Sequence, residues 1–342
     1  MKNPDKILIC YNKPLVNYSD YTGKNSGNEN YASETEIKDN LNLILNYLCE
    51  NYSSVETLEI DSDILKKLSE IKTIAPDICF NLVESINGNS TFESNFAGML
   101  ELLGINYTGN NLLTLAACLD KIITKQLLIS SNIPTPNYSI KKHDSDIVNI
   151  EHLTFPCIIK PSKEDAGIGI SENSIVGSIN ELNKQIDYLS NIYKQDLLIE
   201  EYVDGREFNI SLLDDKILPI SEICFSLPYS MPNIVSYEAK WNEDSIYYKG
   251  TIPKVPADIP KETEDLLITT AISAFKALNC SSYARVDIRL SKNNIPYVID
   301  INPNPDIMPD SGFAKSALAA GISYSELLHY ILTLAKQREK ND

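Results

Sequence analysis

The stretch Tyr283-Ala-Arg-Val-Asp-Ile-Arg-Leu290, followed by Tyr297-Val-Ile-Asp-Ile-Asn302, decides how the fold is interpreted. Polar and apolar residues alternate along both pieces, which predicts two strands of a hairpin that bury one of their faces. We expect the apolar positions to lie in a core, and they are Val286, Ile288, Val298, Ile299 and Ile301.

Two pairs of polar side chains lie among the other positions of this hairpin. A strand places residues i and i+2 on one face, so Arg285 lies beside Asp287. By the same rule Asp300 lies beside Asn302. Carboxylates on otherwise apolar strands are costly unless a cation or donors satisfy them. Oxygen donors of this kind suit Mg²⁺, which keeps waters and phosphate oxygens in its other positions. The alternative is a surface hairpin with a solvated acidic face, although the following Asn-Pro-Asn-Pro run favours a specially shaped loop.

A lysine ends another apolar run, Phe155-Pro-Cys-Ile-Ile-Lys160, and a turn that contains Gly167 and Gly169 follows it. A cation at a strand end and the backbone N–H groups of such a turn can cradle phosphates. The pattern is not a Walker A loop, because Gly-Lys-Ser/Thr is absent and a strand is predicted near Ile168–Ser171, where a helix should begin. On its own, the Gly-x-Gly pattern favours an ordinary hairpin turn.

A third segment, Leu197-Leu-Ile-Glu-Glu-Tyr-Val203, is predicted to be a strand that runs into a polar connection. Its backbone groups and a carboxylate can meet the edge of a purine while apolar side chains sandwich the ring. Taken alone, the segment is better explained as an acidic strand end at the surface.

The N-terminal part of the chain is predicted to alternate strands and helices. Strands are expected at Lys6–Tyr11, Val55–Ile60 and Ile78–Val83, with a helix at Ser33–Asn51 and a long helix at Leu112–Ser130. Strands separated by helices favour a parallel sheet covered on both faces. The rest of the chain is expected to form α+β units, with longer strands at Glu207–Leu213, Ile217–Cys224, Tyr283–Leu290 and Pro296–Asn302.

In their order along the chain, these segments resemble the ATP-grasp superfamily and, more narrowly, the D-alanine–D-alanine ligase family. The resemblance covers nearly the whole chain and extends to Phe80-Asn-Leu, Met99–Gly109, Asp120-Lys-x-x-Thr-Lys125, Ile133-Pro-Thr-Pro136, Tyr237-Glu-Ala-Lys240 and Ala320-Gly-Ile-Ser-Tyr324. It implies an ATP-grasp fold of α/β and α+β class. A Rossmann-like N-terminal domain would span 1–120, a small central subdomain 121–206, and a C-terminal subdomain with the metal site 207–342.

The resemblance also implies roles for the residues at the matched positions. ATP would be held at its phosphates by Lys121, Lys160, Gly167 and Gly169, at adenine by Glu200, Glu201, Tyr202 and Val203, and at the ribose by Glu207. Two magnesium ions would be held by Asp287, Asp300 and Asn302, although the family usually has glutamate where Asp300 stands. The reaction would use Lys240 near the transferred phosphate, Arg285 at the attacked carbonyl and Ser311 at the acceptor's carboxylate.

The implied activity is an ATP-dependent ligation of a small acid to an amine through an acyl phosphate. A carboxylate attacks the γ-phosphate, and an amine then attacks the acyl phosphate through a tetrahedral oxyanion that Arg285 can stabilise. Water must be kept out, so a closing lid is expected at Asp165–Gly169 and Ser230–Tyr248.

The departures from the family pattern concentrate on the substrate side. Ala166 stands where the family has serine, and Trp241 where it has tyrosine. Asp306 lies in a run that departs from the family's Asn-Thr-x-Pro-Gly-Met-Thr, and it can pair with an ammonium group. We therefore expect a carboxylate–amine pair other than D-alanine with D-alanine. The alternatives are a genuine D-alanine–D-alanine ligase and a non-catalytic nucleotide sensor or scaffold.

The first substrate's ammonium has no clear partner in the sequence. The family uses a glutamate in a glycine-rich loop near the N-terminus, but the equivalent region Lys13–Ser33 lacks that glycine pattern. The polar tract Asn17–Asn30 within it is expected to be either a loop near a ligand or a plain surface loop. The candidates for the glutamate are Glu29, Glu34 and Glu36.

The composition bounds the partners of the protein. A formal net charge of −17 argues against nucleic-acid binding, because such proteins neutralise phosphates with a basic patch. The seven cysteines form no C-x-x-C pair and the three histidines have no metal-ligand spacing, so buried free thiols and no zinc are expected. No apolar run suggests a signal peptide or a membrane span. We expect a cytoplasmic enzyme that acts on small molecules. The resemblance to the family alone implies a homodimer.

Overall fold

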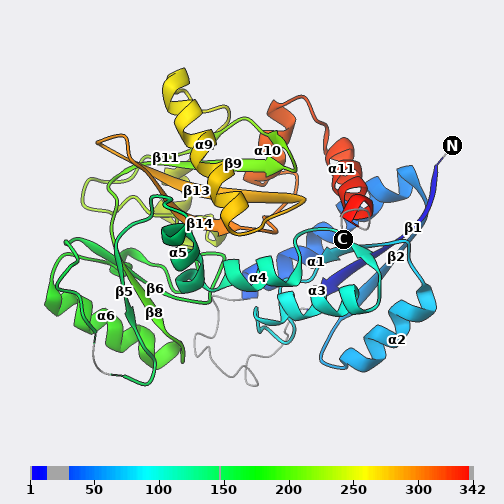
Figure 1. The fold of residues 1–342 in the computed structure, drawn as a ribbon, viewed down its shortest axis with the longest axis horizontal. Coiled ribbons are helices and arrows are strands. Elements are labelled where there is room, and N and C mark those ends of the chain that lie inside the picture. Colours follow the sequence, from blue (N-terminus) through cyan, green and yellow to red (C-terminus); the bar gives the residue numbers. More distant parts are fainter. Residues whose placement is uncertain (1, 14–30, 146–147, 339–342) are drawn as a thin grey trace.

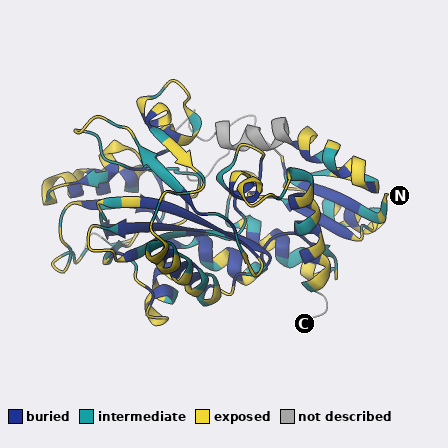
Figure 2. Cartoon of the chain, turned by 90° about the horizontal axis from the view of Figure 1, so that it is seen from above, coloured by how far each residue is buried: buried dark blue, intermediate teal, exposed yellow. Residues whose placement is uncertain are grey.

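The computed structural model describes residues 2–13, 31–145 and 148–338, without the side chains of 31–40. Its strands form three sheets that lie beside one another with helices around them (Figure 1). The strands of the larger sheets are mostly buried, whereas the outer faces of the helices are exposed (Figure 2). The predicted mixture of α/β and α+β units is therefore confirmed.

The N-terminal sheet is parallel and has the strand order β2-β1-β3-β4. Its strands are β1 (Asn3–Asn12), β2 (Tyr52–Ile60), β3 (Ile78–Leu82) and β4 (Asn106–Tyr107). The helices between them are α1 (Tyr31–Asn51), α2 (Ile64–Ile74) and α3 (Phe92–Leu102). The alternation of strands and helices predicted from the sequence is found here, with each strand slightly longer or shorter than expected.

The predicted single helix over Leu112–Ser130 is wrong, because two helices meet at Asp120. These are α4 (Leu112–Leu119) and α5 (Lys121–Ser130). The backbone of Asp120 is extended, and its carboxylate accepts from the N–H groups of Ile122 and Ile123 at 3.0 and 3.3 Å. An aspartate in this conformation caps a new helix by satisfying its first backbone donors. The break places Lys121 in the first turn of α5.

We expect Asp120→Ala to destabilise the protein by about 1 kcal/mol, because the first turn of α5 loses its cap. Asp120→Asn is the matched control, since asparagine caps a helix about as well as aspartate. Asp120→Asn removes only the ion pair between Asp120 and the half-exposed Lys163, whose charged atoms are 3.4 Å apart. Such a pair contributes little to stability in water. Urea denaturation of the two variants checks this; equal losses would show that the cap is unimportant.

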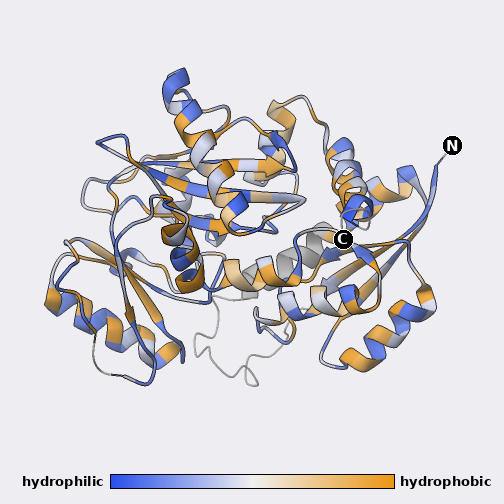
Figure 3. Ribbon diagram, viewed as in Figure 1, coloured by the Kyte–Doolittle hydropathy of each residue, from blue (hydrophilic) through white to orange (hydrophobic). Residues whose placement is uncertain are grey.

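The central sheet is antiparallel and has the strand order β5-β8-β6-β7. Its strands are β5 (Tyr138–Lys141), β6 (Cys157–Pro161), β7 (Ile175–Val176) and β8 (Leu197–Glu201). The helix α6 (Ile179–Ile192) mixes apolar and polar turns (Figure 3) and buries Leu182, Ile186 and Leu189. This unit has a hydrophobic core of its own, made by α6 and the strands.

The strand predicted near Ile168–Ser171 is absent, and a compact turn takes its place. The N–H of Ile168 donates to the carbonyl of Asp165, and that of Ile170 donates to the carbonyl of Gly167, both at 3.0 Å. Successive short-range bonds of this kind wind the chain into turns and leave no extended segment to pair with a neighbour.

The C-terminal sheet is antiparallel, with strand order β12-β11-β9-β13-β14 and β10 paired to β9. Its strands are β9 (Gly205–Leu213), β10 (Lys216–Ile217), β11 (Ser221–Phe225), β12 (Thr251–Lys254), β13 (Tyr283–Ser291) and β14 (Pro296–Asn302). Helix α9 (Lys261–Ala277) covers one face, and the short helices α7 (Tyr237–Trp241) and α8 (Ile246–Gly250) lie between β11 and β12. The predicted strand Ile217–Cys224 is instead split between β10 and β11, and Pro219 lies in the gap, where it cannot donate to a ladder.

One predicted core residue of the β13–β14 hairpin, Ile299, is not buried. Asp287 lies opposite Asp300 while Ile288 lies opposite Val298, so a bulge leaves Ile299 without a partner of its own. The extra residue shifts the alternation of the strand. Ile299 and Asp300 therefore both border the cavity described below, whereas Val286, Ile288, Val298 and Ile301 are buried as expected.

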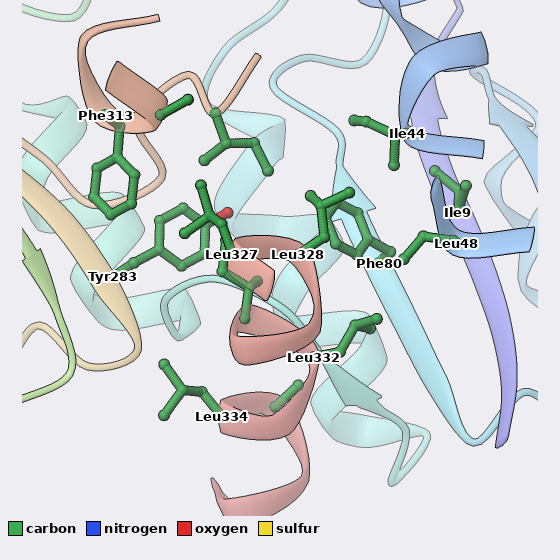
Figure 4. Packing of buried hydrophobic residues seen from close by; sticks show 14 of the residues in the cluster. Ile9, Ile44, Leu48, Phe80, Tyr283, Phe313, Leu327, Leu328, Leu332 and Leu334 are labelled. Carbon is green, nitrogen blue, oxygen red and sulfur yellow. The ribbon is translucent and has the colours of Figure 1, made fainter. Parts of the chain in front are cut away.

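The last two helices, α10 (Gly312–Ala319) and α11 (Tyr324–Gln337), join the C-terminal sheet to the N-terminal sheet. Figure 4 shows Leu327 and Leu328 of α11 between Phe313 and Tyr283 on one side and Ile44 and Phe80 on the other. These residues belong to one continuous hydrophobic core that draws on both sheets. The shared core fixes the N-terminal sheet against the C-terminal sheet.

Two features expected from the sequence concern the whole chain. No helix in the described part of the chain combines the length and the apolar character that crossing a membrane requires. The cysteines are free thiols, as expected, but Cys49 is exposed on α1 and Cys224 is half-buried rather than buried.

Candidate active site

A cavity of about 280 Å³ lies between the central and the C-terminal sheets. Segments far apart in the sequence meet in its wall. Of the predicted site residues, the wall contains Lys121, Lys160, Ala166, Gly167, Glu200, Glu201, Tyr202, Val203, Glu207, Lys240, Arg285, Asp287, Asp300 and Asn302. It does not contain Gly169, Trp241, Asp306 or Ser311.

The polar face of the C-terminal sheet forms one side of the cavity. Arg285 holds Asp287 with two hydrogen bonds, from Nε to Oδ1 at 2.7 Å and from Nη2 to Oδ2 at 2.8 Å. Asn302 on β14 donates to Oδ2 of Asp287 at 3.1 Å. Asn209, directly opposite on β9, donates to Oδ1 at 2.8 Å. The sequence analysis missed Asn209, although it is two residues after Glu207 and therefore on the same face.

The donor set at this face fits Mg²⁺. Asp287 and Asp300 lie directly opposite each other, and Asn302 uses its Nδ2 toward Asp287, which leaves its amide oxygen as a ligand. Among the described residues, no cluster of three or more His, Cys, Asp and Glu could hold a metal. A magnesium ion here would therefore have two carboxylates, one amide oxygen, and phosphate oxygens or water.

Asp300 is kept ionised by its surroundings. Burial favours the neutral acid, but Lys121, Lys160 and Arg285 outweigh it and hold the pKa of the Asp300 carboxyl below its usual value. Lys240 acts in the same direction. A carboxylate among several cations is suited to bind a metal ion that in turn binds an anionic ligand.

Glu200, in the wall of the cavity, joins two buried lysines. Lys160 on β6 lies 2.6 Å from Oε2 of Glu200, and Lys125 on α5 contacts Oε1. Burial alone would raise the pKa of Glu200, but the two lysines lower it below its usual value. Lys125 was not predicted as a site residue; its signal was its position four residues after Lys121 on one helix face. The carboxylate fixes the position of the Lys160 ammonium group in the cavity wall.

Lys121 is tied to the turn that follows β6. Its Nζ donates to Oδ1 of Asp165 at 2.9 Å and to the carbonyl of Glu164 at 2.8 Å. Gly167 and Gly169 in this turn have left-handed backbones, with φ of +79° and +78°. A Cβ on Gly167 would lie 3.0 Å from the backbone N of Tyr237, and one on Gly169 only 2.6 Å from the ring of Pro161. Both positions therefore require glycine. The absence of side chains at these positions lets the turn pack closely against Tyr237 and Pro161.

The two segments predicted to form a lid contact each other. The indole Nε1 of Trp241 donates to the carbonyl of Ala166 at 3.2 Å. The N–H of Tyr237 donates to the carbonyl of Ile170, also at 3.2 Å. Ala166 and Ile170 line the cavity from one segment, as Lys240 does from the other. Together they form one wall.

The wall of the cavity also contains apolar side chains, among them Ile158, Ile223, Ile234, Ile299 and Val203. The carboxylate of Glu201 is used elsewhere, because it accepts from Asn137 at 2.9 Å and from the N–H of Thr154 at 2.8 Å. Both oxygens of the Glu201 carboxylate are therefore already engaged outside the cavity. Glu207 is paired with Arg289, which the sequence analysis did not single out.

The remaining predicted residues lie near the cavity rather than in its wall. The hydroxyl of Ser311 accepts from the N–H of Ala314 at 3.2 Å and caps α10. The carboxylate of Asp306 accepts from the N–H of Met308 at 2.8 Å and is open to solvent. Most of Lys13–Ser33 lies outside the described residues, as does Glu29, and the side chains of Glu34 and Glu36 are not described.

Comparison with known proteins identifies the family. Residues 128–333 match the family model described as D-ala D-ala ligase C-terminus. The D-alanine–D-alanine ligase A of Bacillus cereus is 34% identical over 309 residues, which cover 88% of this chain and 94% of that protein. The chain belongs to the D-alanine–D-alanine ligase family. It is thus an ATP-dependent ligase that forms carbon–nitrogen bonds, and the alternative of a non-catalytic sensor or scaffold is set aside.

Other members of the D-alanine–D-alanine ligase family and its relatives agree with this assignment. The crystal structure of a D-alanine–D-alanine ligase from Bacillus anthracis complexed with ATP has a TM-score of 0.77 and 26% identity, and covers 98% of this chain and 99% of that one. The uncharacterized protein y4sG of Sinorhizobium fredii is 35% identical over 265 residues, 76% of this chain and 74% of that protein. The predicted ATP-grasp fold is confirmed.

Proposed function

We propose that this ligase uses ATP and Mg²⁺ to activate a small carboxylic acid as an acyl phosphate and couples it to an amine, with a substrate pair other than two D-alanines. The observation that carries the chemistry is the meeting of cations and carboxylates around one cavity. The cations are Lys121, Lys160, Lys240 and Arg285, and the carboxylates are Asp287 and Asp300.

In the first step, an oxygen of the substrate carboxylate forms a bond to the γ-phosphorus, and the bond from that phosphorus to ADP breaks. Lys121 and Lys160 approach from the central unit and Lys240 from the lid segment, so the phosphate charge is neutralised from two sides. Bound Mg²⁺ would supply further charge to the phosphate oxygens. Glu200 keeps Lys160 in place through this step.

In the second step, the nitrogen of the neutral amine bonds to the acyl carbon, and inorganic phosphate leaves with the electrons of the broken C–O bond and can take up the proton that the nitrogen loses. Negative charge develops on the acyl oxygen of the tetrahedral intermediate. Arg285 gives Nε and Nη2 to Asp287, so the guanidinium is rigid and its Nη1 can donate to that oxygen. The hydroxyl oxygen of Ser311 accepts a hydrogen bond from the N–H of Ala314 in α10. Its O–H can therefore donate to the carboxylate of the acceptor substrate.

The acyl phosphate must be protected from water. The hydrogen bonds of Trp241 with Ala166 and of Tyr237 with Ile170 bring the two lid segments together along one wall of the cavity. Ile234, Ala239 and Tyr247 support this contact with a small apolar cluster. An apolar seam at this place supports the exclusion of water during turnover.

Three positions support a redirected substrate. Where the family pattern has two hydroxyl side chains, this chain has Ala166 and Trp241, which meet through a backbone carbonyl and an indole N–H. Asp306 adds a carboxylate to the connection between β14 and α10, where the chain departs from the family pattern. Specificity depends on a few polar groups around the substrate, so these changes favour a different acid, a different amine, or both.

The second candidate is D-alanine–D-alanine ligation itself. The identity to ligase A of Bacillus cereus over 88% of the chain favours it. Phosphate release from ATP and Mg²⁺ with D- and L-amino acids, singly and in pairs, with mass detection of products, decides between the two. Dipeptide formation from D-alanine alone would refute the redirected substrate. Turnover only with another acid or an unlike pair would support it.

We expect Asp306→Asn to raise the KM of one substrate selectively, by about 10- to 100-fold, because a charge-assisted hydrogen bond to its ammonium is lost. The KM of ATP should not change. Asp258→Asn makes the same chemical change on an exposed side chain away from the cavity and is the control. Initial-rate kinetics with each substrate varied in turn checks this, and a variant with wild-type KM and kcat for every substrate would refute the role of Asp306.

The proposal includes a division of the chain at 1–120, 121–206 and 207–342, which agrees broadly with the three sheets. It also includes two magnesium ions at Asp287, Asp300 and Asn302, a cytoplasmic location and a homodimer. The family resemblance supports these points. Light scattering on the purified protein tests the dimer.

A further inference from the structure

Arg289 is a buried cation in the wall of the cavity, and the mechanism above does not use it. It lies on β13 two residues after Asp287, and its side chain is only about 5% exposed. Its neighbours in the cavity wall are Tyr202, Val203 and Glu207. Burial of an arginine and a glutamate is costly even when they pair, and apolar side chains of similar volume would often serve stability as well. The pair therefore calls for a functional explanation.

The contacts of Arg289 fix its guanidinium in one place. Nε and Nη2 lie 2.9 and 2.7 Å from Oε2 of Glu207, which is directly opposite on β9. Nη2 also donates to the carbonyl of Asn233, and Nη1 lies 3.4 Å from the carbonyl of Val203. The guanidinium carbon is 5.5 Å from the centre of the Tyr202 ring and 5.4 Å from that of Phe225. A guanidinium held at its edges and between two rings has little freedom to move.

The pairing uses only one oxygen of Glu207. Both contacts from Arg289 go to Oε2, and none of the hydrogen bonds among the described residues goes to Oε1. Since Glu207 lines the cavity, Oε1 is the oxygen that a ligand would meet. A carboxylate fixed through one oxygen presents the other at a defined position and accepts a hydroxyl strongly.

We propose that Arg289 is a positioning residue that orients Glu207 toward a ribose hydroxyl and so makes the enzyme select ribonucleotides over deoxyribonucleotides. The inference rests on the proposed use of ATP, with its adenine between the apolar residues of the cavity and its ribose at Glu207. Arg289 acts on the nucleotide through Glu207, while the aromatic rings of Tyr202 and Phe225 pack against its guanidinium and restrict its movement.

The test is the affinity for ATP, 2′-deoxy-ATP and 3′-deoxy-ATP, measured by calorimetry in the presence of Mg²⁺. For the wild type we expect about 10- to 100-fold weaker binding of the analogue that lacks the recognised hydroxyl. Arg289→Met should reduce that preference to about threefold or less and weaken ATP binding. Glu207→Gln should reduce the same preference, and the double variant should be no worse than Glu207→Gln, because both changes remove one interaction.

A matched control is available on the same sheet. Arg206 donates to both oxygens of Glu222 at 2.7 Å and stacks on Phe208, but it is half-exposed and does not line the cavity. Arg206→Met should keep the wild-type preference. If Arg289→Met does not fold, Arg289→Lys replaces it, with an intermediate preference expected because lysine cannot reproduce the planar contacts.

The outcomes separate the inference from the proposed function. If Arg289→Met lowered the affinities for ATP and for the deoxy analogues equally, or if Arg289→Lys kept the wild-type preference, the positioning role would be wrong. The proposed use of ATP would still stand. A wild-type enzyme that binds all three nucleotides equally would overturn it too. Failure of the wild type to bind any nucleotide would instead overturn the proposed function and the inference with it.

Discussion

Asp300→Asn is expected to lower kcat by about a thousandfold with little change in the KM of ATP. Asp300 lies on β14 opposite Asp287 and is ionised among Lys121, Lys160 and Arg285. A metal ion in phosphoryl transfer contributes several kcal/mol to the stabilisation of the transition state, and about 4 kcal/mol corresponds to a thousandfold in rate. Loss of the negative charge leaves the surrounding cations to attract ATP, so ground-state binding should persist.

The measurement is initial-rate kinetics with the substrate pair found by the panel, across a range of Mg²⁺ concentrations. Asp258→Asn is the matched control, because it makes the same chemical change on an exposed side chain away from the cavity. Asp300→Glu should retain more activity than Asp300→Asn, since it keeps a carboxylate. If Asp300→Asn kept most of its kcat, the carboxylate would only balance charge and the proposed metal site would be wrong.

Glu200→Gln is expected to destabilise the protein by about 3–5 kcal/mol, because it leaves two buried lysines without their counter-charge. The side chain of Glu200 is 2% exposed, and those of Lys125 and Lys160 are 3% and 9% exposed. Glutamine has the same shape, so packing is kept and the charge alone is removed. Equilibrium denaturation at pH 7 measures the loss.

A surface pair with the same geometry is the control for Glu200→Gln. Asp204 lies 2.6 Å from Lys292, the same distance as Glu200 from Lys160, but both partners are exposed. Asp204→Asn should have no measurable effect, because water and salt screen such pairs. Comparable losses in the two variants would contradict the argument from burial.

The pH dependence gives the Glu200 prediction a second readout. Lys125 and Lys160 hold the folded-state pKa of Glu200 below the ordinary 4.5. The stabilisation is therefore complete above the pKa of the unfolded chain and is lost as the pH falls through the lower, folded-state value. The gap in stability between the wild type and Glu200→Gln should narrow steadily below about pH 4.5. A gap that stays constant in acid would argue against an ionised Glu200.

The sequence predicted those features that depend on local periodicity. Alternation along the β13–β14 hairpin placed Arg285 and Asp287 on one face, because a strand has a fixed period of two. The partial exposure of Ile299 was not predicted, because it results from a bulge in the pairing of β14 with β13. The sequence of one strand does not specify its register with another. The break at Asp120 was missed because apolar spacing continues through it, although an aspartate is a common helix cap.

Pairings across the fold could not be predicted in the same way. Glu200 was expected to meet a purine, yet its carboxylate joins Lys125 and Lys160. That contact depends on the order of the strands in the central sheet and on where α5 packs. Arg289 had the signal of its spacing from Asp287, but its partner Glu207 is fixed only by the pairing of β13 with β9.

The core that α11 shares with both outer sheets has a consequence for synthesis on the ribosome. The N-terminal strands end at Leu82 in β3, apart from the short β4, but their apolar face is covered only when α11, beginning at Tyr324, has been made. The intervening 241 residues take about 12–48 s to synthesise at about 5–20 residues per second. During that time Ile9, Ile44 and Phe80 lack their final partners. The N-terminal unit therefore acquires the last part of its core only after α11 has been made, late in translation.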